Sequence, residues 1–242
     1  MATFVLVAGA CCGGWIWKRV APLVRAAGHD IFTATLTGLG ERVHLAAPEV
    51  DLETHVTDLV NLLVYEDLRD VTLVGWSYGG MAITGVAENV PERLAQVVYL
   101  DGAVPADGEN FYDGLGAPRE VRDADAAAAE AAGCPGFVLP LADMIRAQAK
   151  DPADHDWLLA KHVPQPAASF TQLIRLGDPP PLLPRAYVYS TQGKDDPLWG
   201  FTVRAAERAR SDPGWRVVEL ADNHFAPINS PQATAEALLS LV

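Results

Sequence analysis

The sequence predicts an α/β fold with a mostly parallel central sheet flanked by helices. Short apolar, β-branched runs alternate along the chain with segments of helical periodicity. Several of these runs are apolar at every position, as in parallel strands that are buried on both faces. The 242 residues, 50% of them hydrophobic, are enough for one well-buried core. We therefore expect a single domain over residues 1–242.

Six runs are predicted as strands because they are short, β-branched and followed by turn residues. They are residues 3–7, 31–35, 71–74, 97–100, 186–189 and 217–220. Helical patterns lie between or after them, at residues 17–27, 52–63, 80–89, 202–209 and 232–241. Before the last of these, Ser230 is the expected N-cap and Pro231 the first helical residue.

A long segment, residues 105–184, interrupts this alternation. It contains an Ala/Asp/Glu-rich helical stretch at 120–132, a second helical stretch at 141–150 and a proline cluster at 179–181. Loops of this length without structure of their own are uncommon in compact domains, and they are usually functional. The segment is therefore predicted to be a helical lid inserted between two strands of the sheet.

The charge argues against two classes of partner. With 18 basic and 31 acidic residues, the formal net charge is −13, and no Lys/Arg stripe offers to neutralise phosphates. Nucleic acid and anionic membranes are therefore not expected as partners. No run is long enough for a membrane-spanning helix, and the apolar start of the chain lacks the basic region of a signal peptide.

The three cysteines, Cys11, Cys12 and Cys134, form no CxxC motif and no Cys/His ligand cluster. They indicate neither a disulfide framework nor a metal site, and reduced thiols fit a cytoplasmic protein best. We expect a small-molecule substrate and no cofactor, and a homodimer remains an option for the assembly.

The segment from Gly75 to Gly79 reads Gly-Trp-Ser-Tyr-Gly and stands between a predicted strand and a predicted helix. A GxSxG in this context makes a sharp turn that exposes the serine hydroxyl at its apex, with the helix N-terminus beside it. Ser77 is therefore the candidate nucleophile, and the alternative is a turn serine without chemistry. A serine needs a base to accept its proton.

His224 is the candidate base among six histidines, because it follows the last predicted strand. Loops after parallel strands are where α/β sheets place their sites. The third group should be a carboxylate that orients the imidazole, and Asp195 and Asp196 follow the penultimate strand. Asp196 is the first choice and Asp195 the reserve, although both also suit an ordinary turn.

These residues resemble the α/β-hydrolase superfamily, in particular the branch of plant methylesterases, hydroxynitrile lyases and bacterial esterases. The similarity is carried by FVLVAGACCGGWIW, AAGHDIFTATLTGLGE and VTLVGWSYGGMAITGVAENVPERL, together with the Asp and His loops. It covers most of the chain except the lid. The resemblance implies that Ser77, His224 and Asp196 form the triad, and that the backbone N–H groups of Ala10 and Tyr78 form the oxyanion hole.

The chain departs from that pattern beside the serine. Relatives usually have His-Gly where this chain has Ala8-Gly9, and a histidine where it has Trp76. The expected oxyanion donors are backbone N–H groups, so neither change removes them, but the shape of the pocket should differ. The expected pocket residues are Trp76, Cys11, Met144, Trp157, His162 and Phe170. Cys12 is also expected near the pocket, and no base for it is visible in the sequence.

Three functions are compatible with these features. The first is a serine hydrolase for a neutral carboxylic ester or methyl carbamate, as the resemblance to carbendazim-type carbamate hydrolases implies. The second is a hydroxynitrile lyase, which needs a cation beside the histidine, where this chain has Phe225. The third is a ligand receptor without catalysis. The apolar lid, which has no arginine pair, favours neutral substrates cleaved without a metal.

Overall fold

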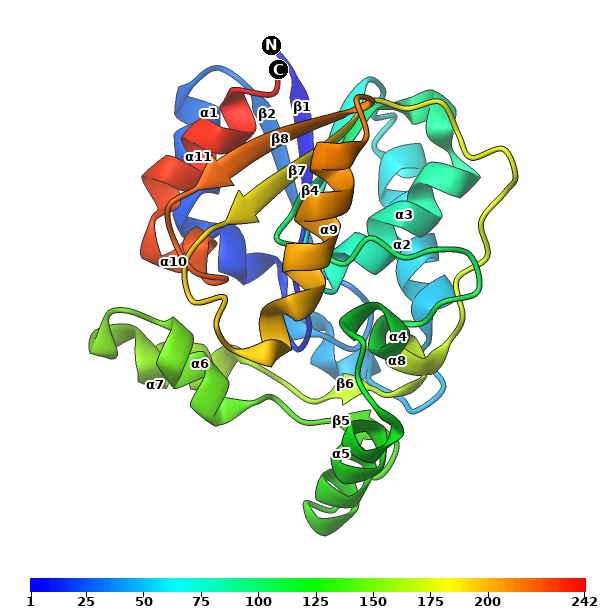
Figure 1. The fold of residues 1–242 in the computed structure, drawn as a ribbon, viewed down its shortest axis with the longest axis vertical. Coiled ribbons are helices and arrows are strands. Elements are labelled where there is room, and N and C mark those ends of the chain that lie inside the picture. Colours follow the sequence, from blue (N-terminus) through cyan, green and yellow to red (C-terminus); the bar gives the residue numbers. More distant parts are fainter.

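The computed structural model describes residues 1–242, and a six-stranded sheet forms its centre (Figure 1). The strands are β1 (Thr3–Val7), β2 (Asp30–Ala34), β3 (Val71–Trp76), β4 (Leu94–Leu100), β7 (Arg185–Ser190) and β8 (Trp215–Leu220). They pair in the order β2-β1-β3-β4-β7-β8, and all of these pairings are parallel. The six predicted strands are therefore confirmed, with small shifts at their ends.

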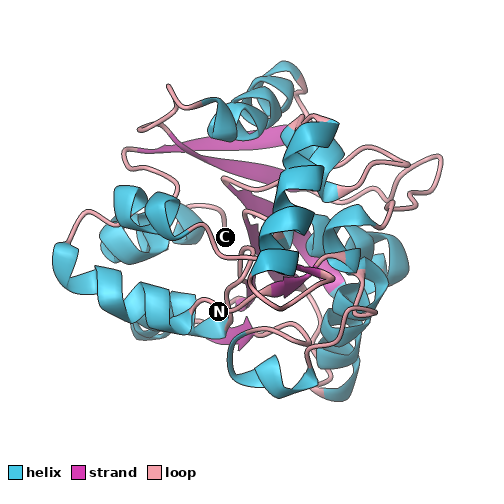
Figure 2. Ribbon diagram, turned by 90° about the horizontal axis from the view of Figure 1, so that it is seen from below, coloured by secondary structure: helices cyan, strands magenta, loops and turns pink.

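Helices cover both faces of the sheet (Figures 1 and 2). One face carries α1 (Ala21–Ala26) and α11 (Pro231–Leu239), and the other carries α2 (Leu52–Tyr65), α3 (Gly79–Asn89) and α9 (Gly200–Ser211). The predicted helix at 17–27 is instead a 3₁₀ turn, η1 (Gly14–Arg19), followed by the short α1. Pro22 has no N–H for an intrahelical bond, so it is accommodated in the first turn of α1 but not in the interior of a longer helix.

Strand side chains alternate between two hydrophobic cores. Val5, Val7 and Leu73 belong to the core beneath α2, α3 and α9. Phe4 and Leu6 belong to the core beneath α1 and α11. This two-sided burial follows from the period of two along a strand, and it explains why the strands read as continuous apolar runs.

Ser230 stands before α11 and Pro231 begins the helix, as predicted, but the serine does not cap it. Its hydroxyl donates instead to the Asp222 carboxylate. A buried carboxylate is a strong acceptor, and the bond to it takes the serine hydroxyl away from the helix N-terminus.

Between β4 and β7 the chain leaves the sheet. This segment contains α4 (Phe111–Leu115), α5 (Arg119–Ala131), β5 (Phe137–Val138), α6 (Ala142–Gln148), α7 (His155–Lys161), β6 (Gln165–Pro166) and α8 (Ala168–Thr171). The two predicted helices are present as α5 and the shorter α6, and α7 was not predicted. In Figure 1 these elements lie beyond the ends of the strands, opposite the two chain termini, and α5 projects from the body.

The remaining short elements connect the layers. They are η2 (Gly40–Leu45), η3 (Pro91–Arg93), η4 (Pro152–Asp154), η5 (Pro197–Trp199) and α10 (Ala226–Asn229). None of the helices combines the length and the hydropathy needed to cross a membrane.

Candidate active site

Ser77 lies at the apex of the turn between β3 and α3, with a left-handed φ of 55°. A non-glycine residue in this region is strained, and such strain is typical of a nucleophile on a sharp strand-to-helix turn. The glycines on either side are required by the close approach of the two elements. A Cβ on Gly75 would lie 2.6 Å from the carbonyl oxygen of Gly79, and one on Gly79 would lie 2.8 Å from that of Ala8.

Two backbone N–H groups beside Ser77 donate no hydrogen bond within the protein. They belong to Ala10, in the loop after β1, and to Tyr78, which follows the serine and precedes α3. These are the two groups that the resemblance assigned to an oxyanion hole. An N–H at the start of a helix has no intrahelical acceptor and favours negative charge.

The loop that carries Ala10 is held by the inserted segment. The N–H of Cys11 donates to Oε1 of the buried Gln165 at 2.8 Å, and the carbonyl of Cys11 accepts from the N–H of Val163 at 3.1 Å. Cys11 itself has a left-handed φ of 59°. Both backbone polar groups of this strained residue are therefore fixed by residues from the other side of the site. No motif in the sequence predicts this role for Gln165.

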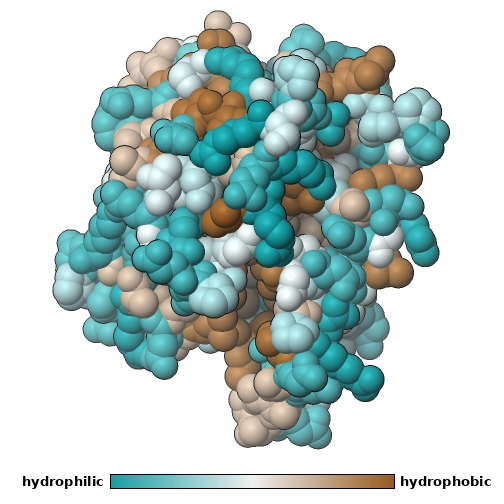
Figure 3. Space-filling view, viewed as in Figure 1, coloured by the Kyte–Doolittle hydropathy of each residue, from teal (hydrophilic) through white to brown (hydrophobic).

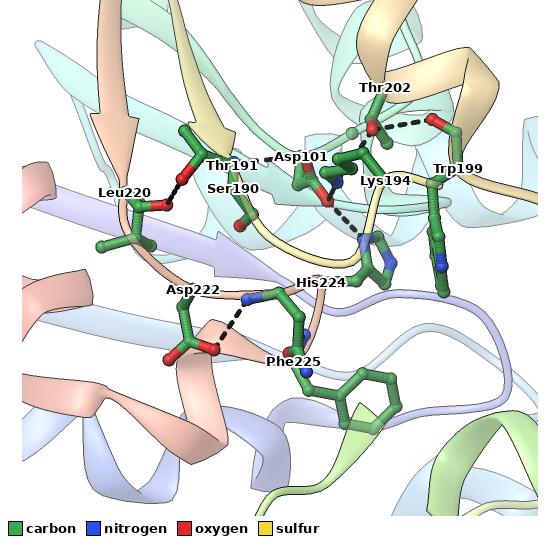
Figure 4. Close-up of polar contacts among 12 residues, drawn as sticks. Asp101, Ser190, Thr191, Lys194, Trp199, Thr202, Leu220, Asp222, His224 and Phe225 are labelled. Atoms are coloured by element: carbon green, nitrogen blue, oxygen red, sulfur yellow. Dashed lines mark hydrogen bonds and ion pairs between the residues drawn. The ribbon is translucent and has the colours of Figure 1, made fainter. Parts of the chain in front are cut away.

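His224 follows β8, and its imidazole hydrogen-bonds to a buried carboxylate, that of Asp101 (Figure 4). The distance from Nδ1 to Asp101 Oδ2 is 2.7 Å. Because an ionised carboxylate only accepts, Nδ1 of the neutral ring carries the proton and Nε2 remains an acceptor. The ring lies between two tryptophans, with centroids 4.2 Å from Trp199 and 5.2 Å from Trp76.

Asp101 directly follows β4, is 0% exposed and has a left-handed φ of 44°. Besides His224, its Oδ2 accepts from Lys194 Nζ at 2.6 Å, and its Oδ1 accepts from the N–H of Ser190 at 3.3 Å. Lys194 also donates to Thr202 Oγ1 at 2.9 Å (Figure 4). One buried carboxylate is thus bonded by a histidine, a lysine and a backbone amide.

Burial lowers the pKa of His224, because the charged imidazolium is poorly solvated. The bond to Asp101 partly opposes this effect by raising the pKa, and the Lys194 ammonium adds to the lowering. Burial also lowers the pKa of Lys194, and Asp101 again acts in the opposite direction. The imidazole is consequently held in the neutral form, which can accept a proton.

The structure differs from the prediction for the third residue. Asp195 and Asp196 are both exposed, and neither contacts His224. The Asp196 carboxylate accepts from the N–H of Leu198 at 2.9 Å and caps η5, because Pro197 starts that turn immediately after it. The carboxylate paired with His224 is Asp101. Asp101 could have been considered from the sequence YLDGAVP, because this aspartate directly follows an apolar strand, as site residues in parallel sheets do.

Trp76, at the position where relatives usually have histidine, supports the His224 loop. Its indole N–H donates to the backbone carbonyl of His224 at 2.9 Å. The residue is buried and contacts Phe225 edge to face. The residue before the candidate nucleophile therefore fixes the backbone of the candidate base.

Ser77 and His224 both line a cavity of about 230 Å³ between the sheet and the inserted segment. Hydrophobic residues make up 18 of its 23 lining residues, so a bound molecule would be largely desolvated. On the molecular surface, hydrophobic residues gather where the projecting α5 joins the body (Figure 3). The cavity lies at the carboxyl ends of the strands, as expected for an α/β sheet.

Five of the six expected pocket residues line this cavity: Cys11, Trp76, Met144, His162 and Phe170. Ala10 also lines it. Trp157 does not, because on α7 its ring packs against Trp15 at a centroid distance of 5.3 Å and beneath the Arg19 guanidinium. Tyr78 presents only its backbone to the site, since its buried ring extends to His55, whose Nδ1 lies 2.8 Å from the tyrosine hydroxyl.

Cys12 has a partner that the sequence did not reveal. Its Sγ lies 3.1 Å from Nε2 of His162, and both residues line the cavity. The other ring nitrogen of His162 lies 2.7 Å from the carbonyl of Leu158, which fixes its proton there. Burial raises the pKa of the Cys12 thiol well above its usual value, so the pair consists of a thiol and a neutral imidazole.

No group of three or more His, Cys, Asp or Glu side chains is arranged to hold a metal ion. Ser77, His224 and the backbone of Ala10 meet at this cavity. A strained serine after a strand, a histidine oriented by a buried carboxylate and two unpaired N–H groups together are the arrangement of an acyl-transfer enzyme.

The chain matches the alpha/beta hydrolase family over residues 4–237, and it belongs to that family. It is 36% identical to the carbendazim hydrolyzing esterase of Nocardioides sp. (strain SG-4G), over the full length of both chains. The chain is an esterase of the α/β-hydrolase type.

Solved structures share this fold. An extracellular alpha/beta-hydrolase from a Paenibacillus species superimposes with a TM-score of 0.81 at 22% identity, covering 99% of this chain and 98% of its own. The Arabidopsis methylesterase MES16 superimposes with a TM-score of 0.77 at 25% identity, covering 100% of this chain and 98% of its own. The inserted segment is included in both superpositions.

Proposed function

We propose that the chain hydrolyses neutral carboxylic esters or methyl carbamates through a Ser77–His224–Asp101 triad. The observation that carries this proposal is the 2.7 Å bond from His224 Nδ1 to the buried Asp101, which leaves Nε2 free in a cavity also lined by Ser77. The bond fixes both the tautomer and the orientation of the base. The full-length relative named for carbendazim hydrolysis supports the carbamate as a substrate.

In the first half of the reaction, Ser77 Oγ attacks the carbonyl carbon and its proton passes to His224 Nε2. The N–H groups of Ala10 and Tyr78 donate to the carbonyl oxygen as it becomes negative. Nε2 then gives the proton to the departing alkoxide, and the acyl group remains on Ser77. Asp101 stabilises the imidazolium that exists between these two proton transfers.

In the second half, His224 takes a proton from water, and the resulting nucleophile attacks the acyl-enzyme. The carboxylic or carbamic acid leaves, and the proton on Nε2 returns to Ser77 Oγ. The apolar cavity favours uncharged substrates, because an anionic group would lose its hydration without a compensating cation in the lining. No step draws on a metal ion or an organic cofactor.

The lyase alternative is less well supported. It needs a cation beside the base that contacts the departing anion, and the cavity lining contains no lysine or arginine. Lys194 is bonded to Asp101 and is not among the lining residues. A receptor without catalysis gains no support from a strained serine beside two unpaired N–H donors.

The nucleophile is tested by Ser77→Ala, which should fold normally and lose several orders of magnitude in kcat, because the hydroxyl that forms the acyl-enzyme is removed. Mass spectrometry after treatment with a neutral organophosphate should find the adduct on Ser77. The matched control is Cys12→Ala, which removes the cysteine thiol paired with His162 and should still be labelled at Ser77. Labelling at Cys12 in the native protein, or a Ser77→Ala variant with most of its rate, contradicts the mechanism.

A further inference from the structure

One wall of the cavity carries an unneutralised charge. Apart from the aromatic residues and the cysteines, the polar side chains of the lining are Ser77, His224, His162 and Asp125. The first two belong to the proposed chemistry, and His162 is bonded to Cys12 and to a backbone carbonyl. Asp125 is the only Asp, Glu, Lys or Arg in the lining, and the proposed reaction gives it no task.

Asp125 lies on α5, one turn after Val121, and both residues line the cavity. Its Oδ2 accepts from the Tyr112 hydroxyl at 2.8 Å. Burial raises the pKa of Tyr112, and the adjacent carboxylate raises it further, so the hydroxyl keeps its proton and donates. Tyr112, which also lines the cavity, thereby holds the carboxylate in place.

The cation closest in sequence does not neutralise this carboxylate. Arg122 pairs with Asp113 and lies over the Tyr112 ring, with 5.2 Å from Cζ to the ring centroid. Asp125 forms no ion pair, and its Oδ1 accepts no hydrogen bond within the protein. A carboxylate has about four acceptor sites, so several remain for a ligand in this mostly apolar cavity.

We propose that Asp125, positioned by Tyr112, is a recognition site for a nitrogen donor on the substrate, an ammonium or a heteroaromatic N–H. This inference rests on the proposed hydrolysis, and it adds to the neutral substrates those aromatic esters and carbamates that carry such a nitrogen donor, including cationic ones. The bond joins an ionised acceptor to an N–H, which is stronger than a bond between neutral partners. The Asp125 carboxylate repels substrates that carry a free carboxylate or a phosphate group.

The test uses three methyl esters that differ in one para substituent: methyl 4-(aminomethyl)benzoate, methyl 4-methylbenzoate and monomethyl terephthalate. For the native protein, kcat/KM should fall in that order. Asp125→Asn keeps the size and the bond from Tyr112 but removes the charge. It should lower kcat/KM for the ammonium ester about tenfold and leave the methyl ester within about twofold. Tyr112→Phe should reduce the same preference without abolishing it.

Asp123→Asn is the matched control, because it removes the same charge from the same helix. Asp123 has a side-chain exposure of 68% and does not line the cavity. A preference due only to the overall charge of −13 would respond equally to both variants. An equal loss for all three esters in Asp125→Asn, or a native protein that does not prefer the ammonium ester, overturns the proposal.

Ligand binding separates this proposal from the proposed hydrolysis. By calorimetry, benzylamine should bind the native protein more tightly than benzyl alcohol or benzoate, and Asp125→Asn should remove the difference. If that difference is present but no ester is cleaved, the hydrolase proposal fails and the recognition site stands. If esters are cleaved but benzylamine shows no Asp125-dependent advantage, the recognition site is wrong.

Discussion

Two neighbouring strands, β4 and β7, each lead into a loop that contains an aspartate, and the two aspartates differ in their burial and in their partners. Asp101 directly follows β4, is fully buried and bonds to His224, Lys194 and a backbone amide. Asp196 lies further along the loop after β7, is exposed and caps its own turn. The β7 loop contributes a cation to the site through Lys194, and the β4 end contributes the anion.

The two aspartates differ because Asp101 is bonded to buried groups of the site, whereas Asp196 is bonded only within its own turn. A residue immediately after a parallel strand is fixed by the sheet, as Asp101 is by the pairing of β4 with β7. A residue in a longer loop follows local turn preferences, and at Asp196 the following proline sets those preferences.

The largest expected effect separates the two aspartates directly. Asp101→Asn should lower kcat by about 10,000-fold, because an amide no longer fixes the tautomer of His224, whereas Asp196→Asn should stay within about twofold. Both variants are assayed with the same aromatic methyl ester. Since the substitution leaves Lys194 buried without its partner, thermal unfolding and the double variant Asp101→Asn/Lys194→Met serve as controls. If Asp196→Asn lowers kcat more than Asp101→Asn does, the carboxylate that orients His224 lies in the β7 loop.

An intermediate effect concerns Lys194 and the pH dependence. His224 must be neutral to act as a base, so activity is lost as the pH falls through its pKa. The Lys194 ammonium helps to lower that pKa, and Lys194→Met should therefore raise it and move the acid limb of kcat/KM to higher pH. The exposed Lys18→Met serves as the control and should leave the limb in place. If the acid limb of Lys194→Met moves to lower pH, the Lys194 ammonium does not lower the pKa of His224.

The smallest effect is structural and concerns Asp196 alone. Asp196→Ala removes the cap of η5 and should lower the free energy of unfolding by about 0.5–1 kcal/mol, with kcat/KM unchanged. Urea unfolding measures the first quantity, and Asp195→Ala, which removes an exposed neighbour that caps nothing, is the comparison. If Asp196→Ala reduces turnover as strongly as Asp101→Asn, the contrast between the two loops is wrong.

Much of the fold could be predicted because strand burial leaves a direct mark on the sequence. The apolar runs of β1 and β3 and the glycines around Ser77 each reflect a local requirement of packing or backbone geometry. His224 could be proposed as the base because it follows a predicted strand by only a few residues. Each of these inferences depended on the residue and its immediate neighbours.

The remaining features depend on contacts between distant parts of the chain. Asp101 is bonded to Lys194 and His224, which are 93 and 123 residues away in the sequence. The residues next to Asp101 do not indicate these partners. The pairing of Cys12 with His162 likewise joins residues 150 positions apart. Trp157 was expected in the pocket on composition, but the orientation of α7 turns it toward Trp15.

The backbone of Cys11 has a consequence for engineering. Its N–H and carbonyl are bonded to Gln165 and Val163, so part of the oxyanion loop is held by the segment that also lines the substrate cavity. In a chimera that exchanges residues 105–184 for those of a relative, specificity and turnover would change together. A graft that ends before Val163 and retains Gln165 would allow the substrate range to be altered while the alignment of the Ala10 N–H is preserved.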